Sequence, residues 1–244
     1  MCAGCCSDAQ PRANGRRRRL APPSLKPIGI LGGTFNPVHY GHLRIAEELG
    51  DALDLDEVRL MPANLPPLRT APGVSGQERL HMVRLAIAGN DRLVADEREV
   101  AKTSLCYTVD TLAELRAEFG PERPICLMLG ADAFARLHRW HRWRDLFSLA
   151  HFAVAERGGH ASIATAPLDH GLAAELRARR VSEIGMLAEQ PAGSIYLAPT
   201  SVLQISATRI RGLIANGASA RYLLPQPVLD YIHERGIYRQ AEDQ

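Results

Sequence analysis

The sequence predicts an α/β fold in which an open parallel sheet carries helices on both faces and a small helical part follows at the C-terminus. Short apolar runs of strand length alternate with longer stretches of helical periodicity through most of the 244 residues. The first unit, residues 28–61, reads strand, helix, strand, which favours a right-handed connection between parallel strands. After residue 205 only helical patterns remain. These observations favour one domain over residues 27–240.

Residues 1–26 lack hydrophobic periodicity, and we expect them to form a disordered basic tail. The tail contains Cys2, Cys5 and Cys6, followed by the run Arg16–Arg19. No long apolar segment follows these arginines, so a secretory signal is not expected. Two alternatives stay open: a metal site at the cysteines, which lacks a fourth spaced ligand, and contact of the arginines with RNA or acidic lipid.

Composition and charge narrow the range of partners. The net charge is +2 and no apolar run reaches the length of a membrane span, so neither nucleic acid nor a membrane is expected as a partner. Cys106 and Cys126 give no disulfide framework, which favours the reducing cytoplasm. The oligomeric state is not predicted by the sequence.

The most informative stretch, Ile28–Arg44, reads IGILGGTFNPVHYGHLR. It begins as a short buried strand, which Gly32 and Gly33 are expected to break so that a ligand can approach backbone N–H groups. The Asn36-Pro37 pair signals a turn, and a helical pattern starts at about His39. Free N–H groups and the positive dipole end at this helix start favour binding of a phosphate.

His39 and His42 lie three positions apart and therefore share one side of the first helical turn. Each imidazole can donate a hydrogen bond, and a cationic form would add positive charge. A single histidine in such a place is more often structural, and a glycine pair after a strand is common. The combination G-G-T-F-N-P-x-H-x-G-H is far rarer and predicts a site for nucleotide phosphates.

This stretch resembles the signature of the H-x-G-H nucleotidyltransferase superfamily, which also includes class I aminoacyl-tRNA synthetases. Residues 27–239 are similar to the bacterial nicotinate-nucleotide adenylyltransferases. The resemblance implies a Rossmann-like sheet and adenylyl transfer from ATP to nicotinate mononucleotide, giving deamido-NAD and pyrophosphate in NAD biosynthesis. It also implies that residues of this stretch bind ATP, namely Gly32, Gly33, Thr34, Phe35, His39 and His42.

A second strand is expected at 57–61, and it ends in a proline-stiffened loop at 62–69. Ligands of open parallel sheets bind beyond the carboxyl ends of strands, so Arg69 in this loop is a candidate contact for the ATP triphosphate. A solvated loop arginine is the equally weighted alternative. The family carries P-P-H-[KR] here, which Arg69 matches while Leu68 replaces the histidine.

The remaining elements follow from periodicity and end signals. Ser75 and Glu78 predict a capping box at the start of a helix. We expect helices at 75–88, at 168–179, at 222–238 and in a segment that ends at 119, and strands at 93–95, 124–129, 151–155 and 194–197. Residues 160–192 are otherwise polar and uneven, which favours a mobile loop.

By resemblance, the start of the helix that ends at residue 119 helps to hold the pyridine carboxylate of the mononucleotide. The family pattern P-S-Y-T-x-x-T-L is matched at Tyr107 and Thr108, while Leu105 and Cys106 depart from it. Backbone N–H groups at a helix start suit a carboxylate. An ordinary N-cap at Thr108 is the alternative, and both interpretations can hold together.

Three more positions match family elements that bind the mononucleotide. Asp132 follows a central strand and suits ribose hydroxyls, with a helix cap as the alternative. Trp140 matches the element F-x(5)-W-x-x-[WY], in which an indole stacks on the pyridinium ring, while Trp143 is expected to pack in the core. Arg157 is a candidate for nucleotide phosphates, although Glu156 replaces a second arginine of the family.

Near the C-terminus, the segment I-S-A-T-R-I-R predicts a second phosphate site. Ser206 or Thr208 would cap a helix, so that hydroxyls, free N–H groups and Arg211 converge there. A capped helix followed by an arginine is common by itself, but this segment matches the superfamily pattern I-S-x-T-x-I-R. The resemblance therefore assigns Ser206, Thr208 and Arg211 to ATP.

The expected chemistry is direct attack of a mononucleotide phosphate oxygen on the α-phosphorus of ATP. That nucleophile is already an anion, so the expected catalytic residues, His39, His42 and Arg211, position phosphates and stabilise negative charge. The sequence shows no carboxylate metal box, so Mg²⁺ is expected to arrive bound to the ATP phosphates.

Several other functions stay open at this point. The acceptor can be nicotinamide mononucleotide or another phosphorylated compound. A class I synthetase should add a lysine-rich signature loop and an anticodon domain, and a phosphopantetheine or cytidylyl transferase lacks the Trp140 element. A non-catalytic nucleotide-binding or RNA-binding module that uses the arginine tail is the alternative of another class, and removal of residues 1–26 separates it from an enzyme.

Overall fold

The computed structural model describes residues 25–64, 73–157, 162–201 and 203–239. The strands are β1 (Ile28–Gly33), β2 (Glu57–Pro62), β3 (Leu93–Ala95), β4 (Ile125–Gly130), β5 (His151–Arg157), β6 (Arg180–Val181) and β7 (Ile195–Thr200). The helices are α1 (Tyr40–Ala52), α2 (Gly76–Ile87), α3 (Thr108–Phe119), α4 (Ala131–Phe134), the 3₁₀ helix η1 (Leu137–Arg139), α5 (Leu146–Leu149), α6 (His170–Arg179), α7 (Gly185–Ala188), α8 (Ala207–Ala215) and α9 (Gln226–Glu234). Residues 1–24 of the predicted tail and the candidate Arg69 lie outside the described residues.

The seven strands pair in the order β3-β2-β1-β4-β5-β7-β6, and all of these pairings are parallel. Ile28 of β1 lies opposite Glu57 of β2 on one side and Ile125 of β4 on the other. The chain therefore runs outward from β1 to β3 and then returns to place β4 on the free side of β1. Open α/β sheets bind ligands outside the carboxyl ends of the strands at such a reversal, and we call this region beyond β1 and β4 the crevice.

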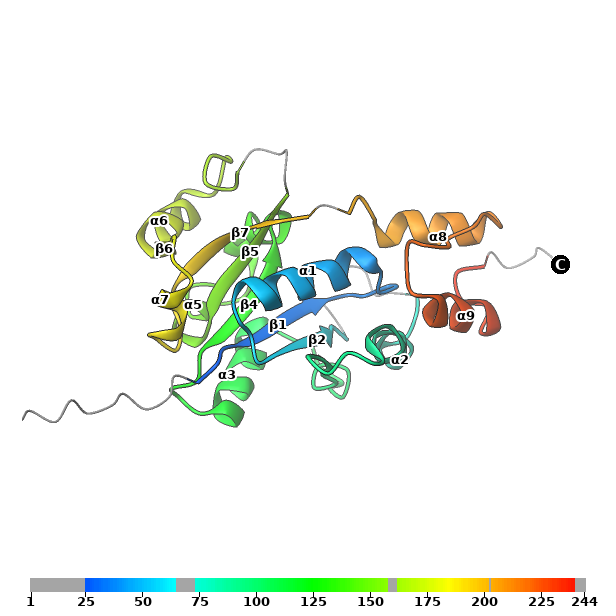
Figure 1. Ribbon diagram of the computed structural model, residues 1–244, viewed down its shortest axis with the longest axis horizontal. Coiled ribbons are helices and arrows are strands. Elements are labelled where there is room, and N and C mark those ends of the chain that lie inside the picture. Colours follow the sequence, from blue (N-terminus) through cyan, green and yellow to red (C-terminus); the bar gives the residue numbers. More distant parts are fainter. Residues whose placement is uncertain (1–24, 65–72, 158–161, 202, 240–244) are drawn as a thin grey trace, which may run out of the picture.

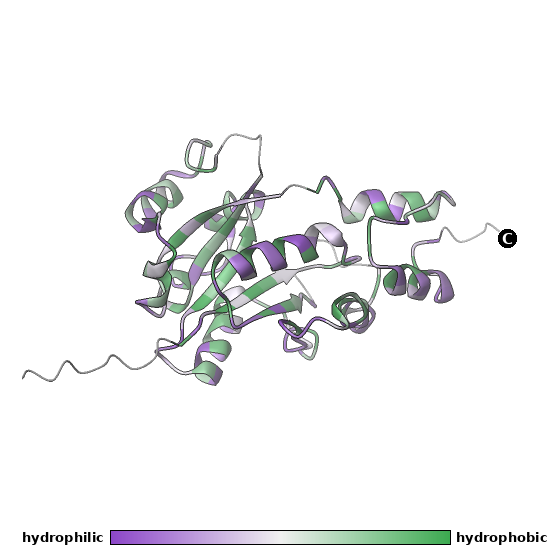
Figure 2. Ribbon diagram, viewed as in Figure 1, coloured by the Kyte–Doolittle hydropathy of each residue, from purple (hydrophilic) through white to green (hydrophobic). Residues whose placement is uncertain are grey.

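Helices cover both faces of the sheet, as predicted. One buried apolar cluster joins the strands to residues of α1, α2, α8 and α9, and a second cluster joins them to α3, η1, α5 and α6. Hydrophobic residues follow the central strands, whereas α1 turns hydrophilic residues outward (Figure 2). Among the described segments, none of the helices combines the length and apolar character that crossing a bilayer requires.

The C-terminal helices α8 and α9 lie beyond the end of the sheet at which α1 begins (Figure 1). Ile210 and Ile214 of α8 and Val228 and Ile232 of α9 join the same apolar cluster as α1 and α2. The backbone N–H of Tyr40 donates to the carbonyl of a residue before α9, Leu223, at 3.1 Å. The predicted C-terminal helical part is therefore packed onto the first turn of α1.

Three expectations about single elements were wrong. Gly32 and Gly33 do not break the first strand but are its last two residues, and neither has a positive φ. The final helix is shorter than 222–238, because Tyr222, with φ +65°, lies in the preceding turn and Gly236, with φ +62°, follows the helix end. Residues 162–192 hold β6 and α7 in addition to α6, since β6 finds its partner only in the distant β7.

Candidate active site

His39 and His42 stand at the start of α1, where the crevice opens. His39 is the N-cap residue and is 5% exposed, and His42 follows on the same side of the first turn. Their rings stack with centroids 3.7 Å apart and planes inclined by 24°. The backbone N–H of His39 donates to Nδ1 of His42 at 3.3 Å. An accepting Nδ1 places the ring proton of His42 on Nε2, which makes Nε2–H the hydrogen-bond donor of this ring.

The burial of His39 decides its charge. Burial lowers the pKa of His39 from its ordinary value to about 4, so the imidazole is neutral at neutral pH. Among the described residues, its buried Nδ1 has no hydrogen-bond partner. The expectation that a cationic form adds charge was therefore wrong for His39, which can act only as a neutral donor or acceptor.

The glycine between the two histidines leaves space for the His39 ring. A Cβ atom at Gly41 would lie 3.0 Å from Nδ1 and 3.1 Å from Cε1 of His39. These contacts are tight, so the ring would have to shift by a few tenths of an ångström to admit a larger residue. The Gly in H-x-G-H therefore favours the close packing of the first histidine.

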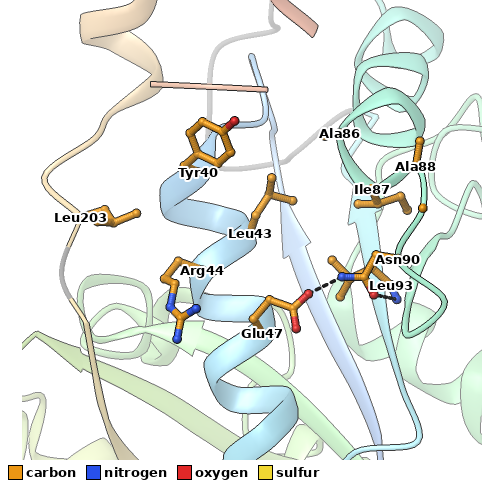
Figure 3. A pocket seen from close by; sticks show the side chains of 11 residues that line it. Tyr40, Leu43, Arg44, Glu47, Ala86, Ile87, Ala88, Asn90, Leu93 and Leu203 are labelled. Atoms are coloured by element: carbon orange, nitrogen blue, oxygen red, sulfur yellow. Dashed lines mark hydrogen bonds between the residues drawn. The ribbon is translucent and has the colours of Figure 1, made fainter. Parts of the chain in front are cut away.

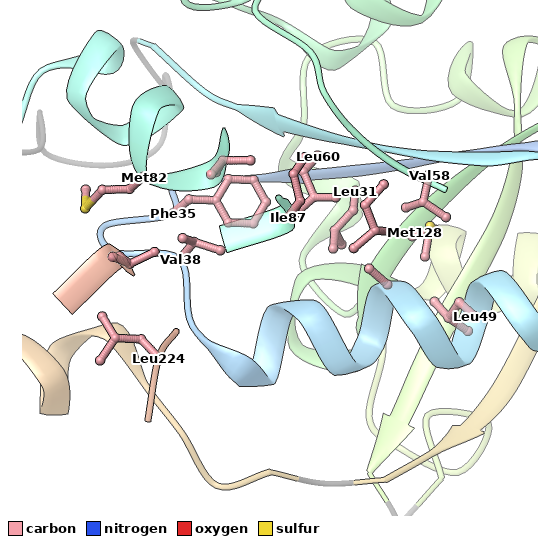
Figure 4. Packing of buried hydrophobic residues seen from close by; sticks show 14 of the residues in the cluster. Leu31, Phe35, Val38, Leu49, Val58, Leu60, Met82, Ile87, Met128 and Leu224 are labelled. Carbon is pink, nitrogen blue, oxygen red and sulfur yellow. The ribbon is translucent and has the colours of Figure 1, made fainter. Parts of the chain in front are cut away.

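The loop between β1 and α1 folds its apolar residues inward. Phe35, which has φ +47° and is 1% exposed, belongs to the same apolar cluster as Val38, Met82 and Leu224 (Figure 4). Its ring also meets the ring of His42 edge-on, with centroids 4.9 Å apart. The Phe35 side chain thus supports His42 from the core and is too buried to serve as a surface for a nucleotide base.

Gly32 and Gly33, which precede this loop, differ in the space around them, although both were expected to let a ligand approach. A Cβ at Gly33 would lie 3.0 to 3.2 Å from the ring of Phe35, whereas nothing lies within 4 Å of a Cβ at Gly32. Gly33 therefore admits the Phe35 ring, and only Gly32 borders open space in which a ligand can approach the backbone.

The predicted second phosphate site lies next to the histidines. Ser206 caps α8 by accepting the backbone N–H of Arg209 at 3.2 Å. The carbonyl oxygen of Ile205 lies 3.7 Å from the position that a Cβ of Gly41 would occupy. Arg211 donates from Nη1 to the carbonyl of Asn36 at 2.8 Å. These contacts bring the start of α8 and the start of α1 together across 175 residues of sequence separation.

Two residues that sequence reasoning missed hold the same loop. Arg79 of α2 donates to the carbonyl of Thr34 at 2.7 Å. Tyr238, which follows α9, donates its hydroxyl to Oδ1 of Asn36. The sequence offered one signal for Arg79, which stands one position before the inward Leu80 of an amphipathic helix. Nothing near Tyr238 in the sequence pointed to a contact with Asn36.

The residues predicted for the mononucleotide come from four segments, one of which directly follows the carboxyl end of β4. Asp132 is exposed on α4, directly after this strand, and Trp140 is partly buried against the second apolar cluster. The Tyr107 ring lies against the ring of His141, the neighbour of Trp140, with centroids 4.4 Å apart. The start of α3 and the Trp140 segment are thereby brought together, while Trp143 is 9% exposed and packs in the core as predicted.

Two further predictions concern the start of α3 and the end of β5. Tyr107, not Thr108, is the N-cap of α3, and its side chain makes no capping hydrogen bond, so the alternative of an N-cap at Thr108 was wrong. Arg157 is the last residue of β5 and pairs with Thr200 of β7. Because β4 and β5 are parallel, the backbone of Arg157 lies at the same edge of the sheet as the carboxyl end of β4.

Comparison with known proteins agrees with this arrangement. Residues 30–213 match the family model described as cytidylyltransferase-like. A probable nicotinate-nucleotide adenylyltransferase of Dechloromonas aromatica is 50% identical over 216 residues, which cover 88% of this chain and 99% of the relative. A protein of the same description from Aeromonas hydrophila is 47% identical over 216 residues, covering 88% and 98%. The chain belongs to the nicotinate-nucleotide adenylyltransferase family.

Solved structures support the same fold. The nicotinic acid mononucleotide adenylyltransferase of Plasmodium falciparum, solved in complex with NaAD, aligns with a TM-score of 0.66 over 87% of this chain and 97% of that chain, at 18% identity. A putative nicotinate-nucleotide adenylyltransferase of Vibrio parahaemolyticus aligns with a TM-score of 0.57 over 89% and 98%, at 17% identity. At such identities the likeness shows the fold alone.

Departures from the adenylyltransferase family pattern have local explanations in the structure. Glu156 accepts hydrogen bonds from the Ser162 hydroxyl at 2.6 Å and the Ile163 N–H at 2.7 Å, so it joins the end of β5 to these two residues. The buried thiol of Cys106 lies 3.5 Å from the carbonyl oxygen of Glu99. Leu68 lies outside the described residues.

A cavity of about 420 Å³ lies on another surface, between α1 and the α2–β3 connection (Figure 3). It is lined by apolar side chains such as Leu43 and Ile87 and by Glu47, which accepts hydrogen bonds from Asn90 and Arg92. Its lining includes Tyr40 and Leu43 of the first turn of α1 but neither His39 nor His42. The two histidines therefore do not contribute to this cavity.

The chain offers no resident metal centre in its described portion. No group of three or more histidine, cysteine, aspartate or glutamate side chains there could hold a metal ion. Hard divalent cations such as Mg²⁺ prefer several oxygen ligands. The residues at the crevice are instead hydrogen-bond donors, which suit anionic phosphate oxygens.

Proposed function

We propose that this protein transfers the adenylyl group of ATP to nicotinate mononucleotide, with deamido-NAD and pyrophosphate as products. The observation that carries the proposal is the pairing of the stacked histidines at the start of α1 with the start of α8, joined through the bond from Arg211 to Asn36. Two helix starts and their donors at one crevice suit a polyphosphate. The names of the relatives supply the nicotinate substrate.

In the proposed reaction, a phosphate oxygen of the mononucleotide attacks the α-phosphorus of ATP. A new phosphorus–oxygen bond forms while the bond to the bridging oxygen breaks, and pyrophosphate leaves with the electron pair. No proton transfer to a base is needed, since the nucleophile is an anion. Nε2–H of His42, the hydroxyls of Ser206 and Thr208, and Arg211 would stabilise the charge that develops on the phosphate oxygens.

Glycine backbone groups, Thr34 and Arg69 would complete the ATP site. ATP would enter as its magnesium complex, in which the phosphates and water ligate the ion. For the mononucleotide, we propose Tyr107, Thr108, Asp132, Trp140 and Arg157 as contacts. An indole face at Trp140 suits a cationic pyridinium ring, and free N–H groups at the start of α3 suit its carboxylate.

Pyrophosphate release from ATP tests this proposal. Purified protein is given ATP with nicotinate mononucleotide, nicotinamide mononucleotide or phosphopantetheine, one acceptor at a time. We expect the largest kcat/KM with nicotinate mononucleotide. Faster release with either of the other acceptors would reassign the substrate, and no release with any acceptor would favour a nucleotide-binding module without catalysis.

A further inference from the structure

Arg79 is a buried arginine that the proposed reaction does not use directly. It lies on α2, is 1% exposed, and donates only to backbone carbonyl oxygens among the described residues. The four acceptors and their distances are Thr34 at 2.7 Å and Ala63 at 2.6 Å from Nη1, Asn64 at 3.4 Å from Nη2, and Val74 at 3.3 Å from Nε. One planar guanidinium thus fixes the directions of several peptide groups at once.

The acceptors belong to the loops that continue β1 and β2. Gly33 and Pro62 are opposite each other at the strand ends, and the N–H of Ala63 donates to the carbonyl of Gly33 at 2.9 Å. Thr34 opens the loop that leads to His39, and Ala63 opens the loop that leads toward Arg69. Arg79 therefore joins the two loops that the proposed function uses for ATP.

Arg79 also places a positive charge beside the loops after β1 and β2. Within the described part of the chain it forms no ion pair with a carboxylate, although a buried cation without a counter-ion is costly. Burial lowers the pKa of Arg79, but an arginine starts so far above neutrality that it keeps its proton. A positive potential is thereby left behind the β1–α1 loop, on the side where phosphates would bind.

We infer that Arg79 is a positioning residue for the triphosphate of ATP. It holds the loops after β1 and β2 in one arrangement through the carbonyls of Thr34 and Ala63, and its charge adds to the attraction for phosphate. This inference rests on the proposed function for the nature of the ligand. A residue that served packing alone would affect both nucleotide substrates equally.

The test compares Arg79→Lys and Arg79→Met with a matched variant of the same helix, Arg84→Met. Arg84 is exposed and pairs with Glu97 at 2.5 Å, away from both loops. Calorimetry on the full chain gives the Kd for ATP alone, and steady-state pyrophosphate release gives the KM for nicotinate mononucleotide. Thermal unfolding is recorded for each variant, and assays are run below the lowest midpoint.

We expect Arg79→Met to raise the Kd for ATP by about tenfold or more and Arg79→Lys to raise it less, because lysine keeps the charge but lacks the planar fork. The KM for the mononucleotide should stay near the wild-type value, and Arg84→Met should change neither. Should Arg79→Met fail to fold, Arg79→Lys decides.

Unchanged ATP affinity in the folded variants, or equal weakening for both nucleotides, would overturn the inference. Failure of the proposed function gives a different result. In that case the wild-type protein binds ATP without releasing pyrophosphate, while the effect of Arg79 on the Kd for ATP is still measured.

Discussion

At the scale of single residues, His39 and His42 share one helical turn but differ in surroundings. His39 caps α1 and is buried, whereas His42 accepts from the His39 backbone and lies edge-on to Phe35. The buried ring is held neutral, so the positive potential at the site comes from arginines and helix starts. The two imidazoles therefore have separate roles, which two variants can separate.

The first variant is His42→Ala. Loss of a donor aimed at developing negative charge lowers turnover by about a hundredfold in comparable sites. We expect kcat for pyrophosphate release to fall by that order, with a smaller change in KM. His170→Ala, at the exposed start of α6, is the control and should leave kcat unchanged. Near-normal turnover of His42→Ala would remove this residue from the mechanism.

The second variant, His39→Asn, tests the buried neutral imidazole through stability. Between the unfolded pKa of a histidine and the folded value of about 4, the unfolded chain binds a proton that the folded chain does not. The free energy of unfolding therefore falls as the pH drops, by about 2 kcal/mol between pH 7 and pH 5 from this residue. Asparagine keeps an N-cap side chain but does not titrate.

Denaturant unfolding at pH 7, 6 and 5 measures this contribution as the difference between wild type and variant. The comparison is needed because burial also lowers the pKa of His151, which adds a slope of the same sign to both proteins. We expect the pH slope of His39→Asn to be shallower than that of the wild type. Equal slopes would show that the pKa of His39 is the same in the folded and the unfolded state.

At the scale of elements, the site consists of the starts of helices that lie beside the carboxyl ends of strands. α1 begins after β1, α4 begins directly after β4, and α8 reaches the same place from the far end of the chain. Each helix start leaves backbone N–H groups without partners in its own helix, and together they favour anions. The cap of α8 should therefore matter for both stability and turnover.

Ser206→Ala tests this double role. Removal of the N-cap hydroxyl, which accepts the Arg209 N–H at 3.2 Å, should cost about 1 kcal/mol of stability. It should also lower kcat/KM for ATP by about tenfold, since a charged acceptor loses a hydrogen bond. The measurements are denaturant unfolding and steady-state pyrophosphate release.

The matched control is Asp169→Ala at the N-cap of α6, where the carboxylate accepts the N–H groups of Gly171 and Leu172. This helix lies at the opposite end of the molecule from α8 (Figure 1). The control should lower the unfolding midpoint without changing kcat/KM. If Ser206→Ala behaves like Asp169→Ala, the Ser206 hydroxyl serves the helix alone.

At the scale of the whole molecule, the described chain packs as one sheet with an apolar cluster on each face. The packing begins just after the N-terminal segment. The carbonyl of Lys26 accepts from Arg123 at 3.2 Å, and the carbonyl of Pro27 accepts the N–H of Asp56 at 2.9 Å. We propose that the catalytic domain starts there.

Deletion of residues 1–24 should leave kcat, KM and the unfolding midpoint unchanged, because no described contact is removed. Deletion of residues 1–27 is the comparison and should lower the midpoint, since the acceptors at Lys26 and Pro27 are lost. Steady-state kinetics and thermal unfolding check both proteins. Loss of activity in the shorter deletion would give the cysteine–arginine segment a role in the reaction.

The sequence by itself determined the local structure of this protein and the identity of its motif. The strands at 93–95 and 151–155, the capping box of Ser75 with Glu78 and the shared side of the two histidines follow from residues a few positions apart. Alternation, capping and i, i+3 spacing operate over such short distances, so they can be read from the order of residues. The parallel sheet followed from the same patterns through the βαβ rule.

Only the tertiary structure decided which groups share the crevice and in what state. The neutral His39, the Phe35 ring behind Gly33, and the arginines from α2 and α8 that bond the Thr34–Asn36 backbone depend on elements far apart in the chain. Burial and dielectric surroundings are set by everything that packs around a group, and no local pattern contains that information. The physical reason is that charge state and loop support are properties of the packed molecule, whereas periodicity is a property of the chain.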